Sequence, residues 1–167
     1  MGPGWFEPMG GALGSGGMEI VRAGIHDGEA LKRICVAAKA HWGYPAEWMA
    51  RWEAMVRVTP EYLTRNWAYM AVDGGSAIGW YALVRGFQKC LLDHLWVAPP
   101  RIGSGVGRLL FNHAVAQAQE ADALYLEIES DPNALGFYER MGARQVGEVE
   151  GGMERNIPLL RLDLPPI

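Results

Sequence analysis

One stretch in the middle of the chain constrains the fold more than any other, because three glycines join a strand pattern to a helix pattern. It runs from Cys90 to Leu110, with apolar residues up to Val97, two prolines, and then glycines at positions 103, 105 and 107. A glycine-rich turn that enters a helix leaves backbone N–H groups without partners, and the helix dipole adds partial positive charge there. Such a turn accepts an anion such as a phosphate, because no side chain blocks its approach. The stretch therefore predicts a strand, an anion-binding loop and a helix, in that order.

Length and charge narrow the class of protein. A chain of 167 residues with 50% hydrophobic composition suits one domain with a substantial core. The net charge of −4 argues against a nucleic-acid partner. No apolar run approaches the ~18 residues of a membrane-spanning helix, so no membrane partner is expected. We expect residues 1–17, which are rich in glycine, to form a disordered tail, and residues 18–167 to form the folded domain.

The two cysteines, Cys35 and Cys90, lack the C-x-x-C spacing of a redox or metal motif. Cys35 falls on the apolar face of a predicted helix with Leu31 and Ala38. We therefore expect buried free thiols, which is typical of the reducing cytoplasm, the predicted location. The His, Cys and Asp residues show no metal-ligand spacing, so no metal is predicted.

Turn and capping residues divide the chain before the glycine loop. Thr59 followed by Pro60 is typical of a helix start, because the hydroxyl caps the helix and proline fits its first turn. A tight turn at Asp73 to Gly75 joins two strand patterns into an antiparallel hairpin. Strands are expected over 18–22, 69–72, 77–84 and 90–97, and helices over 27–41, 46–57 and from 60 onward.

After the glycine loop the pattern predicts a long helix, a strand over 124–129, a helix from 131 through 138 that stops at Gly142, and strands over 145–149 and 157–164. A strand–helix–strand unit of this length implies a parallel, right-handed crossover. The predicted fold class is α/β of the α+β type. It has a mixed, mostly antiparallel sheet of about six or seven strands, flanked by helices on both faces.

Three motifs, in this order, resemble the GNAT family of acetyl-CoA-dependent N-acetyltransferases. The segment from Leu92 to Val97 resembles the family's strand beside the cofactor, and Ile102 to Gly107 resembles its pyrophosphate loop. Asp131-Pro-Asn-Ala, followed by Phe137, Tyr138 and Gly142, resembles its last helix. The competing G-x-G-x-x-G and P-loop motifs fail on spacing and on the missing Gly-Lys-Ser/Thr. The resemblance covers nearly everything after residue 18. It implies transfer of an acetyl group from acetyl-CoA to a primary amine by direct attack.

The resemblance also implies which residues hold acetyl-CoA, with no metal involved. The backbone of Leu95, Trp96 and Val97 would pair with the pantetheine arm. The pyrophosphate would lie against Arg101, Ile102, Gly103, Ser104, Gly105, Val106, Gly107 and Arg108. Ile102 stands where relatives carry Gln or Arg, and the two arginines either compensate charge or are solvated. The remaining contacts would come from Asp131, Asn133, Phe137 and Tyr138, and the choice between Asp131 and Asn133 stays open.

Acetyl transfer needs a base, because an amine with a pKa near ~10.4 arrives protonated. Asp93, Glu127 and Glu129 are carboxylates on the strands concerned, and the resemblance makes Asp93 the first choice. Asp93 also has a purely structural interpretation, and Glu127, His94 or a water chain are the alternatives. Tyr138 resembles the family tyrosine that protonates the leaving thiolate; packing beside Phe137 is its other interpretation.

An aromatic segment is expected to line the acceptor site. His41, Trp42 and Tyr44, with Glu129, are the predicted substrate contacts, and aromatic rings suit a cationic or apolar-bodied amine. Trp48, Trp52 and Met55 recur at helical spacing and are instead expected in the core.

The predicted substrate is a small-molecule or peptide amine, and a homodimer through the closing strands is compatible with the sequence. Two other functions fit the same motifs: a non-catalytic acyl-CoA sensor or interaction domain, and an acyltransferase that uses another acyl-CoA.

Overall fold

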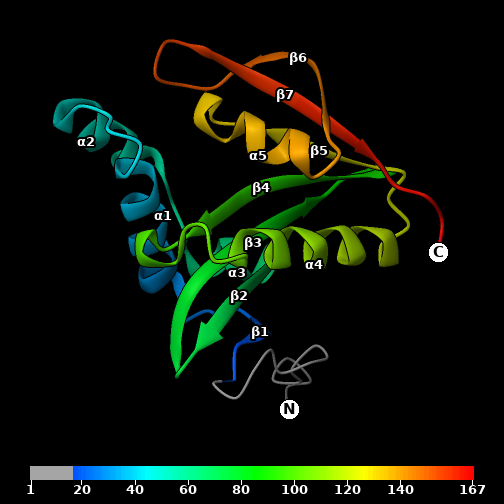
Figure 1. Ribbon diagram of the computed structural model, residues 1–167, viewed down its shortest axis with the longest axis horizontal. Helices are drawn as coiled ribbons and strands as arrows, with labels where there is room; N and C mark the ends of the chain where they lie inside the picture. The colour runs from blue at the N-terminus through cyan, green and yellow to red at the C-terminus, as the bar shows by residue number, and fades with distance from the viewer. Residues whose placement is uncertain (1–16) are drawn as a thin grey trace. The chain divides into compact units, whose positions relative to one another are not determined.

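A computed structural model describes residues 17–167 and shows an α/β domain built on one sheet (Figure 1). The elements are β1 (Glu19–Arg22), α1 (Gly28–Ala40), α2 (Ala46–Met55), α3 (Pro60–Arg65), β2 (Trp67–Asp73), β3 (Ser76–Arg85), β4 (Lys89–Val97), η2 (Pro99–Arg101), α4 (Val106–Glu120), β5 (Tyr125–Glu129), η3 (Pro132–Ala134), α5 (Leu135–Arg140), β6 (Arg144–Glu150) and β7 (Asn156–Asp163). Residues 1–16, which make up most of the predicted tail, lie outside the described residues.

The sheet has the strand order β1-β2-β3-β4-β5-β7-β6 within residues 17–167. β1 pairs antiparallel with β2, and β7 pairs antiparallel with both β5 and β6. The parallel pair is β4 with β5, in the register Lys89–Leu92 against Tyr125–Ile128. The prediction of a mixed, mostly antiparallel sheet with a parallel crossover after the glycine loop is therefore confirmed.

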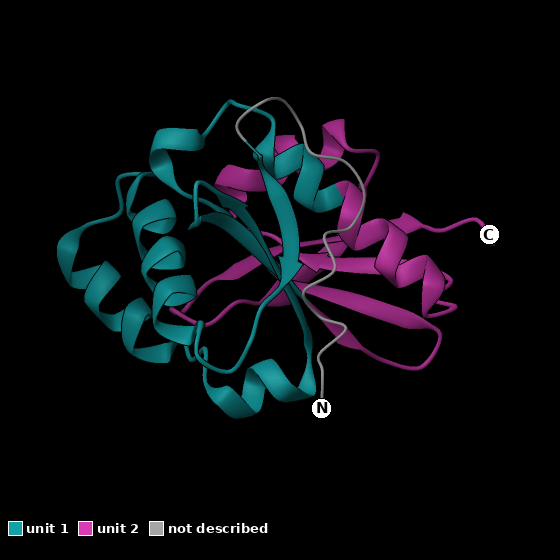
Figure 2. Ribbon diagram, turned by 90° about the horizontal axis from the view of Figure 1, so that it is seen from below, with its two compact units in different colours: residues 1–82, 94–111 teal, residues 83–93, 112–167 magenta. Residues whose placement is uncertain are grey.

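The chain gathers into two compact units (Figure 2). Unit 1 comprises the chain up to Ala82 together with His94–Phe111, and unit 2 comprises Leu83–Asp93 together with Asn112–Ile167. β3, β4 and α4 each contribute residues to both units.

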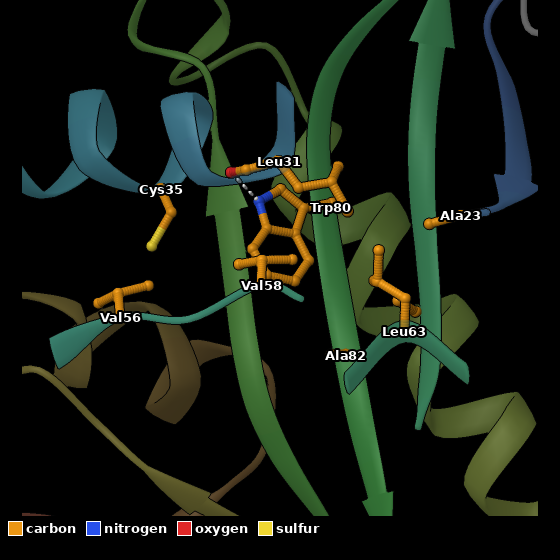
Figure 3. Packing of buried hydrophobic residues seen from close by; sticks show 9 residues of the cluster. Ala23, Leu31, Cys35, Val56, Val58, Leu63, Trp80 and Ala82 are labelled. Carbon is orange, nitrogen blue, oxygen red and sulfur yellow. Dashed lines mark hydrogen bonds between the residues drawn. The ribbon is translucent and has the colours of Figure 1, made fainter. Parts of the chain in front are cut away.

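The core of unit 1 forms where α1 covers one face of the sheet. Trp80 on β3 is fully buried and donates its indole N–H to the carbonyl of Leu31 on α1 at 2.8 Å (Figure 3). This bond satisfies the polar end of a ring that is otherwise in an apolar environment. The same cluster contains Cys35, which is buried and free, as is Cys90 in unit 2. The expectation of buried free thiols is confirmed.

The first turns of α4 cover the opposite face of unit 1. Neighbouring residues on a strand face opposite ways, so Gly79 faces away from the side on which Trp80 meets α1. A Cβ at Gly79 would lie 2.9 Å from the carbonyl oxygen of Trp96 and 3.0 Å from Leu110 on α4. Glycine at this position therefore permits the close approach of α4. The predicted helices on both faces are confirmed by this arrangement.

In unit 2 the sheet is centred on β5, which pairs with β4 on one side and with β7 on the other. Leu126 and Ile128 on β5 and Leu160 on β7 are fully buried. The β6–β7 pairing shifts register between Gln145 and Gly147.

The predicted cap of α3 is confirmed, and α1 begins without a side-chain cap. Thr59 caps α3 as predicted, since its hydroxyl oxygen accepts from the N–H of Tyr62 at 3.1 Å. Asp27 precedes α1, but its carboxylate accepts from the N–H of Gly24 at 2.7 Å and makes no cap bond to the helix.

The predicted core stripe of α2 is wrong at its last position. Met55 is 54% exposed, in a last turn of α2 where Glu53 and Ala54 are exposed as well. Trp52 does pack against the core, whereas Trp48 is half-buried and stacks on Tyr44 with a centroid distance of 3.9 Å. The buried residue of α2 is Met49.

Among residues 17–167, no helix combines the length and hydrophobicity that crossing a bilayer requires.

Candidate active site

The glycine loop between η2 and α4 forms an open cradle in unit 1. Gly103 and Gly105 adopt φ values of +83° and +93°, which side chains rarely tolerate, and a Cβ on either would meet nothing within 4 Å. α4 starts at Val106, and the N–H of Leu109 bonds to the carbonyl of Gly105 at 3.1 Å. The backbone N–H groups that precede Leu109 in the first turn therefore have no acceptor within the helix. Open space beside such donors fits a pyrophosphate group.

The side chains around this cradle are partly engaged elsewhere. Arg101, which was predicted to compensate phosphate charge or to be solvated, pairs with Asp73 at 2.7 Å. Ser104 donates its hydroxyl hydrogen to the carbonyl of Arg101. Ile102 is 49% exposed, and Arg108 is also exposed. The charge of Arg101 is thus shared with Asp73, so the backbone N–H groups are the loop's main candidate for contact with an anion.

The end of β4 carries a hydrogen-bonded pair of rings. Trp96 donates its indole N–H to Nδ1 of His94 at 2.9 Å. Because indole nitrogen only donates, Nδ1 must carry the lone pair, and a neutral His94 then bears its proton on Nε2. His94 also lies 4.7 Å from Trp80 and 5.9 Å from Tyr62, centroid to centroid. His94 was the alternative base, and its basic nitrogen Nδ1 already accepts the hydrogen bond from Trp96.

Three predicted carboxylates come together on one face of unit 2. Glu127 and Glu129 alternate along β5 and share a face, and the parallel register brings Asp93 to the position beside Glu129. Glu127 binds Nζ of Lys89 through both oxygens, at 3.2 and 3.1 Å. This ion pair raises the pKa of Lys89. Glu127 is thus committed to a partner that the sequence did not reveal.

Glu129 is the member of this group of three carboxylates whose pKa is raised. Loss of water around its carboxylate raises the pKa of Glu129, although part of the side chain is exposed. The negative charges of Asp93 and Glu127 raise this pKa further, and Lys89 partly offsets them. A carboxylate with a raised pKa accepts a proton more readily than an ordinary one.

The motif around α5 places Tyr138 in a buried position. Tyr138 is 7% exposed, and its ring meets that of Phe137 edge-on at 5.3 Å. Burial raises the pKa of Tyr138, and the charge of Asp131 raises it further, so the hydroxyl stays protonated. Packing and proton donation are both compatible with this environment.

Asp131 is a structural residue in this motif. One of its oxygens accepts from the backbone N–H and the amide of Asn133, at 2.7 and 2.9 Å. The other accepts from the guanidinium of Arg155 at 3.3 Å. Asn133 itself is exposed. Of the two residues left open by the sequence, Asn133 is the better placed to contact a ligand.

Comparison with known proteins decides the family. The model of the acetyltransferase (GNAT) family matches residues 31–143, which is more than half of the chain. The chain belongs to the GNAT acetyltransferase family. The peptidyl-lysine N-acetyltransferase YjaB of Escherichia coli is 30% identical over 148 residues, covering 87% of this chain and 95% of that protein.

Solved GNAT structures share the fold. The PaiA N-acetyltransferase of Thermoplasma acidophilum, in complex with coenzyme A, has a TM-score of 0.75 at 17% identity, over 87% of this chain and 98% of that one. An IAA acetyltransferase from Bacillus cereus has a TM-score of 0.64 at 22% identity, over 88% and 99% of the two chains. The predicted family and fold class are confirmed.

One residue near the predicted acceptor wall of this GNAT chain was missed by the sequence analysis. His41 is exposed, whereas the rings of Trp42 and Tyr44 lie against the ammonium of Lys39, a lysine that is only 5% exposed. The signal was present, because Lys39 follows Cys35 by four residues and so falls on the buried face of α1. A lysine in an apolar helix stripe that is followed by several aromatic residues, as here, could have indicated a buried cation.

Proposed function

We propose that this GNAT chain transfers the acetyl group of acetyl-CoA to a primary amine by direct attack of the amine. The observation that carries the proposal is the open glycine cradle at the start of α4, where Gly103 and Gly105 hold positive φ values. Membership of an acetyltransferase family supports the same reaction.

Binding would rest mainly on backbone groups of unit 1. The N–H groups of Val106, Gly107 and Arg108 would hold the pyrophosphate at the start of α4. The backbone from Leu95 to Val97 would pair with the pantetheine arm in the manner of an added strand. When bound, acetyl-CoA supplies an acetyl thioester that is activated toward amines.

Proton removal would fall to carboxylates of unit 2. Asp93 is our choice for the base, with Glu129 beside it as the group that shares or relays the proton. The raised pKa of Glu129 supports this pairing, because two neighbouring carboxylates hold one proton more tightly than either does alone. Glu127 is set aside, since its carboxylate neutralises Lys89.

Tyr138 would donate a proton to the departing thiolate. Its burial and raised pKa keep the hydroxyl protonated near neutral pH, which a donor requires. A free thiol has a pKa near ~8.5, below that of a phenol, so proton transfer to a free thiolate is uphill. Tyr138 would therefore act while the C–S bond is still breaking, through a hydrogen bond to the sulfur as negative charge develops there.

The acceptor to test first is the side-chain amine of a lysine in a peptide, because the relative YjaB carries that activity in its name. A small-molecule amine is the second class of acceptor to test.

Calorimetric titration with acetyl-CoA, free CoA and NADH tests the proposal. We expect the two CoA species to bind and NADH to be silent. Gly105→Ala should weaken acetyl-CoA binding about tenfold, because about 1–2 kcal/mol of strain at a positive φ favours loop conformations other than the cradle, and the new methyl enters the cradle. Gly74→Ala is the matched control, because Gly74 also has a positive φ, +58°, with nothing within 4 Å, but lies in the β2–β3 turn. Absence of CoA binding to the wild-type chain would reject the proposed function.

A further inference from the structure

Lys39 occupies a position where the helix pattern calls for an apolar residue. It lies in the last turn of α1 and is 5% exposed, in line with Leu31 and Cys35, both fully buried. Moving an ammonium group out of water is costly unless the protein offers other favourable interactions. The surroundings of Lys39 must therefore stabilise its charge.

Five aromatic rings from three segments of unit 1 surround this ammonium. Trp42 and Tyr44 come from the linker between α1 and α2, Trp48 and Trp52 come from α2, and Trp96 comes from the end of β4. The distances from Nζ of Lys39 to the ring centroids are 5.6, 5.4, 5.5, 4.9 and 5.8 Å in that order. All five fall within the ~6 Å of a cation–π contact. We call these five rings the aromatic cage.

The cage is held together by contacts among its own members. Tyr44 and Trp48 stack with an interplanar angle of 10°, and Trp52 meets Trp96 edge-on at 5.7 Å. The indole N–H of Trp96 is fixed on His94. By comparison, Arg22 lies over the ring of Tyr69 at 5.4 Å. Several rings converging on one cation is the arrangement that recognises alkylammonium groups.

We infer that the aromatic cage is an alkylammonium-binding site whose bound cation is Lys39 of the same chain. The rings come from the α1–α2 linker, from α2 and from β4. Lys39 is therefore a positioning residue that holds the linker and α2 against Trp96 on β4. Lys39 then occupies the position that a cationic ligand of the aromatic cage would take. If the proposed function holds, an acceptor that reaches the aromatic cage turns a neutral or anionic group toward it, because the Lys39 ammonium repels a second ammonium.

The test removes the resident cation and supplies another. Lys39→Ala empties the cage, and tetramethylammonium chloride is titrated while tryptophan fluorescence and the melting temperature are recorded. We expect a saturable fluorescence change and a rise in melting temperature of about 3 °C or more in this variant. The wild-type chain and Lys39→Met, in which the cage stays filled, should respond only as they do to sodium chloride. A silent Lys39→Ala variant, or an equal response of the wild type, overturns the inference.

A second pair of variants covers the case in which Lys39→Ala does not fold. Lys39→Arg keeps a cation among the rings, whereas Lys39→Met keeps the length without the charge. We expect the near-ultraviolet circular dichroism of the tryptophans to match the wild type in Lys39→Arg and to differ in Lys39→Met. A wild-type spectrum for Lys39→Met would show that the cation does not position the rings and would overturn the inference.

An activity measurement links the cage to the acceptor. Lys39→Met should raise kcat/KM for a diamine relative to a monoamine severalfold. If the wild-type chain releases no thiol with any amine, the proposed function is rejected. The tetramethylammonium result does not depend on that activity and would still stand. Thiol release with an unchanged ratio would contradict the role of Lys39 in acceptor choice.

Discussion

Unit 1 surrounds the ammonium of Lys39 with aromatic rings, whereas unit 2 pairs the ammonium of Lys89 with the carboxylate of Glu127. Lys39 is 5% exposed, and the side chain of Lys89 is 39% exposed. In the first arrangement five ring faces surround the ammonium, so its strength depends on packing. The second is an ion pair open to water, which salt and pH weaken. On the proposed function, unit 1 would bind its ligand through backbone N–H groups, and unit 2 would supply the groups that move protons.

The largest expected effect concerns proton handling in unit 2. Asp93→Asn should lower kcat by about a hundredfold, because a positioned base contributes about 10²–10⁴-fold to the rate. The rate of thiol release at saturating substrate concentrations measures the loss. Glu127→Gln is the control, since the carboxylate of Glu127 serves Lys89. A larger loss in the control than in Asp93→Asn would move the base to Glu127.

The next effect separates the two lysines by stability. Lys39→Ala should lower the free energy of unfolding by about 2–4 kcal/mol, because it opens a cavity and removes the contacts with the rings. Lys89→Ala should cost far less, since its ion pair is open to water. Urea denaturation of both variants measures the difference. Equal losses would break the distinction between a packed cation and a solvated one.

Salt sharpens the same distinction with a smaller effect. The cost of Lys89→Ala should shrink as sodium chloride is raised to 0.5 M, where the Debye length falls to a few ångströms, about 4 Å. The cost of Lys39→Ala should stay constant, because the rings screen the ammonium from ions. Melting temperatures across a salt series check both trends, and a salt-dependent cost at Lys39 would be contrary to the proposed cage.

The smallest effect is a pH dependence at Glu129. The pKa of this carboxyl is raised in the folded chain, so folding disfavours its charged form. Below the unfolded pKa of 4.5 the group is neutral in both states, and the cost appears as the pH rises through the folded value. Glu129→Gln should therefore match the wild type near pH 4 and melt about 1–2 °C higher at pH 7. If Glu129→Gln were more stable than the wild type only at low pH, the predicted pH dependence would have the wrong sign.

Local chemistry was predictable from the sequence. The glycine loop before α4, the Thr59 cap and the turn before β3 depend on residues within a few positions of one another. The parallel join of β4 to β5 followed from the length of the crossover. Three short motifs were sufficient to indicate the family, because each one has its own spacing.

Pairings between distant residues were not predictable. Lys89 and Glu127 are 38 positions apart, and Arg101 and Asp73 are 28 positions apart. Both pairs depend on strand register, which turns and periodicity alone do not determine. The aromatic cage around Lys39 was not predictable either, because its rings come from three segments that only the tertiary fold brings together. Met55 was misplaced because the stripe fixed a face of α2 but not the point at which the helix leaves the core.

The sharpest test of the proposed function is the steady-state rate of thiol release, with acetyl-CoA varied, in Gly105→Ala and Tyr138→Phe side by side. We predict that Gly105→Ala raises KM for acetyl-CoA with kcat nearly unchanged, because the cradle belongs to binding. Tyr138→Phe should lower kcat with KM nearly unchanged, because on the proposed function the phenol acts on the departing thiolate. The opposite assignment, with kcat lost at the loop and KM raised at the tyrosine, would contradict the division between a binding unit and a proton-handling unit.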